Sequence, residues 1–177
     1  MTRRLFIFDE PDRFVTGTVG EPGDRTFYLQ ARKGKAVVSV VLEKSQVAVL
    51  AALMTELLST VDRPPPAFKP IADDAPLDEP LVEVFRVGAM ALAWDPSRER
   101  VMIEAQTEDA GGEYLEVADE EDDGPDLMRV RLVAEQAQAF VGRAERLVSG
   151  GRPICPYCGE PLDPAGHFCA RANGLLN

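Results

Sequence analysis

The fold of this chain is decided by the stretch TFYLQARKGKAVVSVVLEKSQVAVLAALMTELLSTV, which covers residues 26–61. Residues 26–32 and 36–42 are rich in β-branched and aromatic side chains, which favour strands. The tripeptide KGK between them is typical of a hairpin turn. From residue 43 to residue 61, apolar side chains recur every three or four positions, which predicts an amphipathic helix. The stretch therefore predicts an antiparallel hairpin followed by a helix.

The apolar stripe of the predicted helix defines the side that faces the protein core. We expect it to cover the sheet, because a helix with one apolar face must bury that face against another layer. A seam between two copies of the chain is an alternative use of the same stripe. Its members are Val47, Leu50, Met54, Leu57 and Val61, widened by Leu53 and Leu58.

The segments around this stretch extend the same pattern. Before it, residues 3–9 and 13–20 read as two further strands, separated by turn residues. After it, residues 62–80 hold six prolines, so neither a helix nor a central strand is expected there. We interpret residues 62–81 as a Pro-rich connector over the surface, with Phe68 and Ile71 as its apolar anchors.

The second half of the chain also predicts strands followed by a helix. Residues 82–94 read as a long strand with a bend or bulge at Gly88. A turn, a returning strand, a weak strand at residues 113–117 and a last strand should follow it. A helix over residues 134–148 ends at a glycine pair. The two remaining strands are predicted at residues 100–106 and 127–133.

A weak internal repeat links the two halves at an offset of ninety residues. Leu42 and Gln46 align with Leu132 and Gln136, each at the junction between a strand and a helix. About four predicted strands precede each helix, so a duplicated unit of four strands and one helix is one interpretation. Chance convergence of two such junctions is the other.

These patterns predict an α+β protein with a mostly antiparallel sheet, two packed helices and a small zinc knuckle at the C-terminus. Residues 1–150 form the predicted body, with possible halves at residues 1–61 and 82–150. Residues 151–177 form the predicted zinc-binding module. The chain of 177 residues is long enough to bury a core of its own.

Charge is unevenly distributed along the chain. The net charge is −11, and residues 104–126 carry eleven acidic side chains and no basic ones. Because a protein that binds phosphates needs a concentrated basic face, nucleic-acid binding is disfavoured. No apolar run approaches the length of a membrane span, and the start of the chain does not read as a signal peptide. We therefore expect a cytoplasmic protein.

All three cysteines and the single histidine lie between residues 155 and 169, in the sequence CPYCGEPLDPAGHFC. Two residues between thiolates let both sulfurs reach one ion, and Gly159 follows where a knuckle turn commonly needs a positive φ. Three thiolates and one imidazole form a closed tetrahedral zinc site, which is usually structural. The predicted ligands are Cys155, Cys158, His167 and Cys169.

Catalytic and cofactor-binding residues are not predicted elsewhere. The sequence has no P-loop, dinucleotide-binding or nucleophile-elbow motif. The charged residues beside strands and turns are better explained as strand-edge and turn residues. If a cleft between the halves served chemistry, it would hold Arg86 with Asp95, or Asp12 with Arg25.

Three stretches carry a resemblance to a known family. They are RFVTGTVGEPGDRTFYLQAR, FRVGAMALAWDP and CPYCGEPLDPAGHFCARANG. Together they resemble an uncharacterised actinobacterial family, domain of unknown function 3090, over nearly the whole chain. The resemblance implies a cysteine- and histidine-bearing C-terminus but no biochemical activity. It also suggests kinase-like and histidine-phosphatase-like proteins as neighbours and candidate partners.

The function that these observations favour is non-catalytic. We expect a cytoplasmic adaptor or scaffold with a structural zinc ion, which binds another protein through the zinc module or the connector. One alternative is a small-molecule binder or enzyme with a cleft between the two halves. A nucleic-acid-binding zinc protein is the second alternative.

Overall fold

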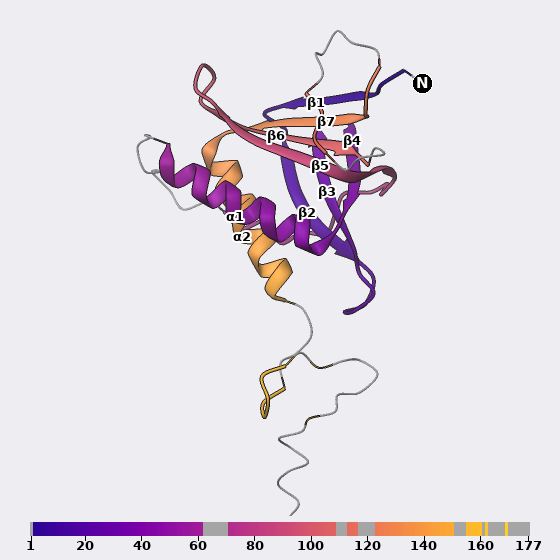
Figure 1. Ribbon diagram of the computed structural model, residues 1–177, viewed down its shortest axis with the longest axis vertical. Helices are drawn as coiled ribbons and strands as arrows, with labels where there is room; N and C mark the ends of the chain where they lie inside the picture. Colours follow the sequence, from indigo (N-terminus) through magenta and orange to yellow (C-terminus); the bar gives the residue numbers. More distant parts are fainter. Residues whose placement is uncertain are drawn as a thin grey trace, which may run out of the picture.

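The computed structural model describes residues 2–61, 71–108, 113–116, 123–150, 155–160, 162 and 169. In these residues strands and helices alternate much as the sequence predicts (Figure 1). The elements are, in order, β1 (Leu5–Asp9), β2 (Arg13–Val19), β3 (Thr26–Lys33), β4 (Ala36–Leu42), α1 (Lys44–Thr60), β5 (Glu83–Asp95), β6 (Arg100–Thr107), β7 (Leu127–Leu132) and α2 (Ala134–Ser149).

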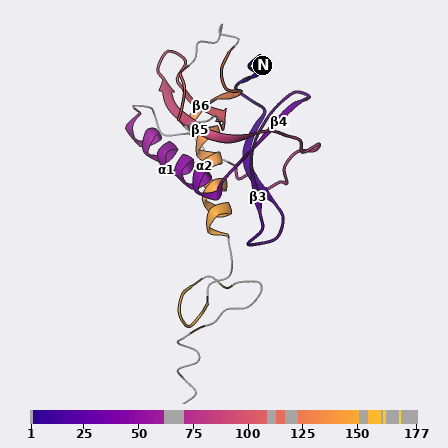
Figure 2. The same cartoon turned by 45° about the vertical axis from the view of Figure 1, so that its right-hand side comes forward.

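The strands form one mixed sheet in the order β1-β7-β6-β5-β4-β3-β2. Neighbours are antiparallel except for two parallel pairs, β1 with β7 and β4 with β5. The sheet thus contains two three-stranded meanders, β2–β3–β4 and β5–β6–β7, joined through the β4–β5 pair. Both helices lie on the same side of it (Figures 1 and 2). The predicted α+β class is confirmed.

The hydrophobic core lies between this inner face of the sheet and the two helices. Phe140 of α2 is 1% exposed and stacks on Phe14 of β2, with ring centroids 4.9 Å apart. Burying a large apolar side chain contributes about 1.5–3 kcal/mol to folding. The stripe of the first helix faces this core through Val47, Leu50 and Met54, whereas Leu53 is 48% exposed.

The sheet curls around α2. This helix follows β7, near one end of the sheet, yet the strand against which it packs most closely is β2, at the other end. Two polar contacts support the packing. Gln136 donates to the carbonyl oxygen of Pro11 at 2.7 Å, and Arg143 donates to that of Thr16 at 2.6 Å. The end strands of the sheet are therefore brought towards each other on the helix side.

The two helices begin in the same way. Gln46 in the first turn of α1 accepts from the backbone N–H of Glu43 at 2.7 Å, and Gln136 of α2 accepts from that of Val133 at 3.3 Å. Each glutamine also donates to a backbone carbonyl in the other half of the sheet. Gln46 donates to that of Val87 in β5, and Gln136 donates to that of Pro11 just before β2. This correspondence fits the predicted repeat. Residues 113–116, where a fourth strand of the second half was predicted, form no strand.

β5 makes both a parallel and an antiparallel pairing, whereas β1 makes a parallel pairing and β2 an antiparallel one. The first residues of β5 pair in parallel with β4, and its remainder pairs antiparallel with β6. The register of the second pairing shifts between Val87 and Ala89, which confirms the predicted bulge at Gly88. β1 likewise pairs in parallel with β7, and β2 pairs antiparallel with β3. The last strand of each meander, β4 or β7, thus pairs in parallel with a strand outside that meander.

The outer face of the sheet is covered by two extended segments. Residues 71–80, hereafter the strap, cross β2 and β3, whereas residues 113–116 contact β6. Gln30, Ser39, Glu104 and Gln106 are consequently buried, although they are polar. The prediction that Ile71 anchors this segment is wrong, because Ile71 is 90% exposed. Phe68 lies outside the described residues.

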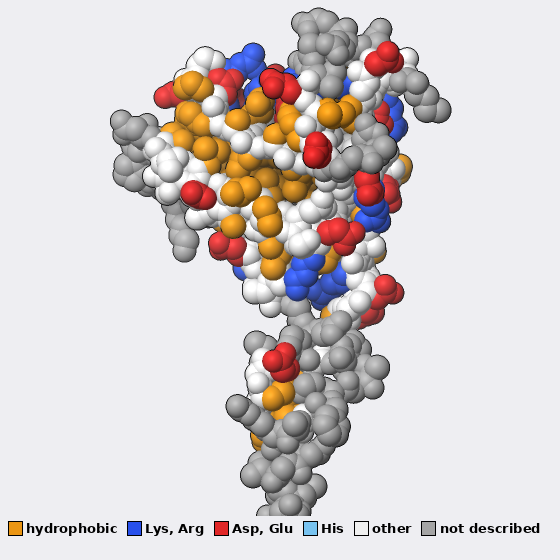
Figure 3. All heavy atoms as spheres, viewed as in Figure 1, with side chains coloured by type: hydrophobic (Ala, Val, Ile, Leu, Met, Phe, Trp, Pro, Cys, Tyr) orange, Lys and Arg blue, Asp and Glu red, His pale blue; other side chains and the backbone are white. Residues whose placement is uncertain are grey.

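Apolar side chains gather on one face of the body, over α1 and the neighbouring β5 (Figure 3). Val49 and Leu53 of α1 are 54% and 48% exposed. Met90, Leu92 and Trp94 of β5 are half-buried. We call these five residues the apolar strip. In the described part of the chain, none of the helices combines the length and apolarity that a membrane crossing requires.

Candidate metal centre

The three cysteines converge at one point. The sulfur atoms of Cys155, Cys158 and Cys169 all lie within 4.8 Å of one another. Cys155 and Cys169 are buried, and Cys158 is half-buried. In a tetrahedral zinc site with bonds of about 2.3 Å, the sulfurs would be roughly 3.8 Å apart. The thiols therefore need to approach by no more than about 1 Å to enclose one ion.

A tight turn holds the first two cysteines. The N–H of Gly159 donates to the carbonyl of Cys155 at 2.9 Å, and the N–H of Cys155 donates to the carbonyl of Glu160 at 2.8 Å. The predicted positive φ at Gly159 is confirmed at 76°. A side chain at this position would be strained, so glycine allows the chain to reverse directly after Cys158.

The turn also prepares one thiol for metal binding. Backbone N–H groups of Cys158 and Tyr157 donate to the sulfur of Cys155 and lower its pKa to about 6. The lowered pKa of Cys155 favours the thiolate, which is the form that binds metals. Cys158 has the opposite shift. The N–H of Glu160 lowers its pKa, but burial and the neighbouring thiols outweigh that effect and raise it.

The described donors fit a thiophilic metal. Three sulfurs at one point suit zinc or another soft ion, whereas magnesium and calcium prefer oxygen ligands. The predicted fourth ligand, His167, lies outside the described residues. The structure therefore brings together three of the four predicted ligands.

Comparison with known proteins places the chain in a family. A family model described as "Protein of unknown function (DUF3090)" matches residues 6–169. The chain belongs to the DUF3090 family. A search of curated proteins and a search of solved structures each returned no match. The match in this DUF3090 protein includes the whole sheet except Leu5, together with both helices and the three cysteines.

The charged residues suggested for a cleft in this DUF3090 protein are not brought together. Arg86 forms an exposed ion pair with Glu43, and Asp95 accepts hydrogen bonds from Ser97 within its own hairpin turn. Asp12 accepts from the N–H of Gly34 at 2.7 Å, whereas Arg25 contacts the carbonyl of Gly150. These contacts match the turn and strand-edge roles that were the simpler interpretation.

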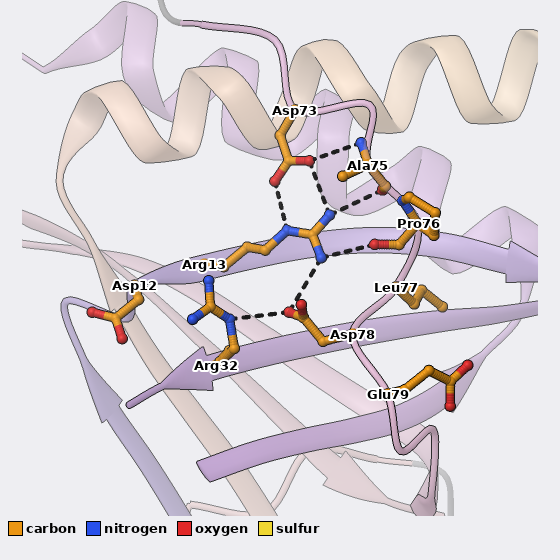
Figure 4. A pocket seen from close by; sticks show the side chains of 9 residues that line it. All are labelled: Asp12, Arg13, Arg32, Asp73, Ala75, Pro76, Leu77, Asp78 and Glu79. Carbon is orange, nitrogen blue, oxygen red and sulfur yellow. Dashed lines mark hydrogen bonds and ion pairs between the residues drawn. The ribbon is translucent and has the colours of Figure 1, made fainter. Parts of the chain in front are cut away.

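One groove of the DUF3090 protein was not foreseen. It has a volume of about 600 Å³ and lies where the strap crosses the ends of β2 and β3 (Figure 4). A second hollow of about 130 Å³ adjoins it, beside Phe140 and Arg143 of α2. Arg13, Asp12 and Asp73 line both. The available sequence signal was weak: arginines within strand patterns, and paired acids in a Pro-rich segment.

Proposed function

We propose that this DUF3090 protein is a non-catalytic, cytoplasmic adaptor that binds another protein and contains a structural zinc ion. Cys155, Cys158 and Cys169 supply the thiolates, and His167 supplies the fourth ligand. The observation that carries this proposal is the convergence of three sulfur atoms within 4.8 Å. A site with three sulfur ligands and one imidazole leaves no open position for substrate, which is typical of structural zinc.

Two surface features support a protein partner. Tyr157, between the two cysteines of the turn, is 57% exposed, although its ring is large and mostly apolar. Tyrosine is enriched in protein interfaces because it combines an apolar ring with a hydroxyl group. The apolar strip on α1 and β5 offers a second contact surface, since contiguous exposed apolar patches often mark interaction sites. Kinase-like and phosphatase-like proteins are the candidate partners.

Metal analysis tests the zinc site directly. We expect one zinc ion per chain in the wild type, and none in Cys155→Ser or Cys158→Ser. Glu160→Gln is the matched control, because it changes a carboxylate beside the turn but keeps the three sulfurs. X-ray absorption should show three sulfur ligands and one nitrogen. An oxygen ligand that exchanges with added cyanide or azide would contradict a closed structural site.

Affinity capture tests the adaptor role. The immobilised wild-type chain should retain a specific protein from native lysate, identified by mass spectrometry. Tyr157→Ala or Val49→Ser/Leu53→Ser should reduce that capture while zinc content stays at one ion per chain. If neither variant changes the proteins captured, the proposed contact surfaces are wrong. If the wild type captures nothing specific, the adaptor role is wrong.

The groove beside the strap favours the alternative of a small-molecule binder. The smaller hollow that adjoins it lies between β2 of the first half and α2 of the second half, as a cleft between halves requires. A metabolite that protected the chain against heat, and lost this effect in Arg13→Gln, would support this alternative over the adaptor. Retention on heparin at low salt would support the nucleic-acid alternative.

A further inference from the structure

Arg13 of β2 is enclosed by the strap. Its guanidinium donates to both carboxylate oxygens of Asp73, at 2.6 and 2.9 Å. It also donates to the carbonyl oxygens of Ala75 and Pro76, each at 2.9 Å, and pairs with Asp78 at 3.2 Å (Figure 4). The Arg13 side chain is only 10% exposed. Its donors are thus directed at one acidic, extended segment.

Two more arginines converge on the same carboxylates from other elements. Arg143 of α2 lies 3.2 Å from the carboxylate of Asp73 and donates to its carbonyl oxygen at 2.6 Å. Arg32 of β3 donates to Asp78 at 3.1 Å. Each carboxylate is therefore shared by two guanidinium groups. Bidentate and multiple contacts of this kind are how arginine recognises carboxylates.

The strap is also recognised through its backbone. The side-chain amide of Gln30 accepts from the N–H of Asp78 at 2.8 Å and donates to its carbonyl at 3.0 Å. Leu77 packs against Gly17 of β2 so closely that a Cβ at that glycine would lie 2.7 Å from it. These contacts read the main chain and one apolar side chain, as grooves for extended peptides do.

The arginines beneath the strap need a negatively charged partner as long as they are buried. The side chain of Arg143 is 12% exposed, and burial lowers its pKa even though Asp73 opposes that effect. A desolvated guanidinium without a partner is costly, and removal of one member of a buried ion pair typically destabilises a protein strongly. In this structure, only the strap supplies Arg13 and Arg32 with the described carboxylates that bind them.

We propose that the surface of β2, β3 and α2 beneath the strap, which carries Arg13, Arg32 and Arg143, is a binding site for an extended acidic segment of a partner protein, and that the strap occupies it as an intramolecular competitor. The recognised pattern is two aspartates separated by four residues, with a leucine before the second. A small anion such as phosphate would meet the arginines but not Gln30 or Gly17, so a peptide fits better. The inference rests on the proposed protein-binding role, but it does not involve the metal centre.

The test uses the strap sequence itself as the probe. A fluorescein-labelled peptide IADDAPLDEP, residues 71–80, is titrated with the full-length protein, and its anisotropy is followed. A tethered competitor acts at an effective concentration of about millimolar. The wild type should therefore bind the peptide weakly, whereas Asp73→Asn/Asp78→Asn should bind it about tenfold more tightly or better, because its own strap competes less.

Matched variants define the specificity of binding. Asp74→Asn is the control within the strap, since Asp74 is 72% exposed and pairs only with Arg146 among the described residues. It should bind the peptide as weakly as the wild type. Adding Arg13→Gln to the double variant should abolish binding, as should replacement of the two aspartates of the peptide by asparagine. Inorganic phosphate at equal concentration should not displace the peptide.

Several outcomes would overturn the inference. They are equal binding by the double variant and the wild type, binding of the asparagine peptide, or displacement by phosphate alone. If the double variant fails to fold, hydrogen exchange measured on the wild type tests the inference instead. Millimolar peptide should speed exchange of the Asp78 amide several-fold, and unchanged exchange would reject the site. Zinc content and lysate capture are measured separately, so failure of the adaptor proposal is distinguishable from failure of this one.

Discussion

Gln30 of β3 and Gln106 of β6 each use one side-chain amide to bind both the N–H and the carbonyl of a single residue on the outer face of the sheet. The residue is Asp78 for Gln30 and Leu115 for Gln106. β3 and β6 are the central strands of the two meanders. The two halves of the sheet thus hold their covering segments by the same chemistry, and both glutamines are only 1% exposed.

Replacing either glutamine by leucine should destabilise the protein by about 1–3 kcal/mol, because a buried N–H and a carbonyl lose their partners. Urea denaturation gives the free energy of unfolding. Hydrogen exchange should also rise locally, at residues 71–80 in Gln30→Leu and at residues 113–116 in Gln106→Leu. Each variant is the control for the other. Identical exchange patterns in the two variants would contradict separate anchoring.

The contact between Asp73 and Arg13 predicts a dependence of stability on acid. The hydrogen bond from Arg13 lowers the pKa of Asp73, and burial opposes this only in part. The carboxylate therefore stabilises the folded state fully above the unfolded pKa of about 4, and this contribution is lost as pH falls through the lower folded pKa.

Thermal unfolding between pH 2 and pH 7 measures this effect. The stability advantage of the wild type over Asp73→Asn should be constant near neutrality and shrink below about pH 4. In an Arg13→Gln background, Asp73→Asn should change the acid dependence less, because only Arg143 and the N–H of Ala75 then lower the pKa of Asp73. If the advantage of the wild type grew on acidification, the pKa of Asp73 would not be lowered in the folded state.

The environment of Tyr114 predicts a change in stability at alkaline pH. Burial, together with its hydrogen bond to the Glu104 carboxylate, raises the pKa of Tyr114 to about 12. Because ionisation is disfavoured in the folded state, this contribution to stability is complete below the unfolded pKa of about 10 and is lost as pH rises through the folded one. The difference in absorbance at 295 nm between wild type and Tyr114→Phe should have its midpoint near pH 12. Glu104→Gln should shift it downward.

The aromatic contact in the core predicts the largest change in stability. Phe140→Ala should lower the free energy of unfolding by about 3–5 kcal/mol, because it leaves a cavity beside Phe14. Val49→Ala on the exposed side of α1 is the control and should change it by about 0.5 kcal/mol or less. A small loss in Phe140→Ala would indicate that α2 is not packed on β2 as described. Denaturant unfolding followed by circular dichroism measures both.

Local patterns in the sequence predicted each strand and helix to within about two residues. Alternation and helical periodicity act over a few positions, so a single segment contains the information needed. The parallel pairing of β1 with β7 was not predicted. Leu5 pairs with Leu127, and no local pattern specifies a partner that far away. The weak strand predicted from residue 113 is absent over residues 113–116, where Leu115 binds the Gln106 side chain rather than a neighbouring strand.

The two candidate sites differ in how far the sequence could predict them. Cys155 and Cys158 are close in sequence, so their spacing alone placed two sulfurs at one point. The arginine groove depends on Arg13, Asp73 and Arg143, which come from three distant segments and meet only after folding. Charged residues of this kind are far commoner than cysteines, so their sequence positions carry little information until the topology is known.

The position of β1 has a consequence for how the chain folds as it leaves the ribosome. β1 is made before its partner β7, which ends at residue 132, so the nascent chain must carry β1 without this partner until β7 has been made. Contacts between such distant segments form slowly because a long loop must close first. The meander β2–β3–β4 can assemble before β7 has been made, whereas β1 can pair with β7 only afterwards.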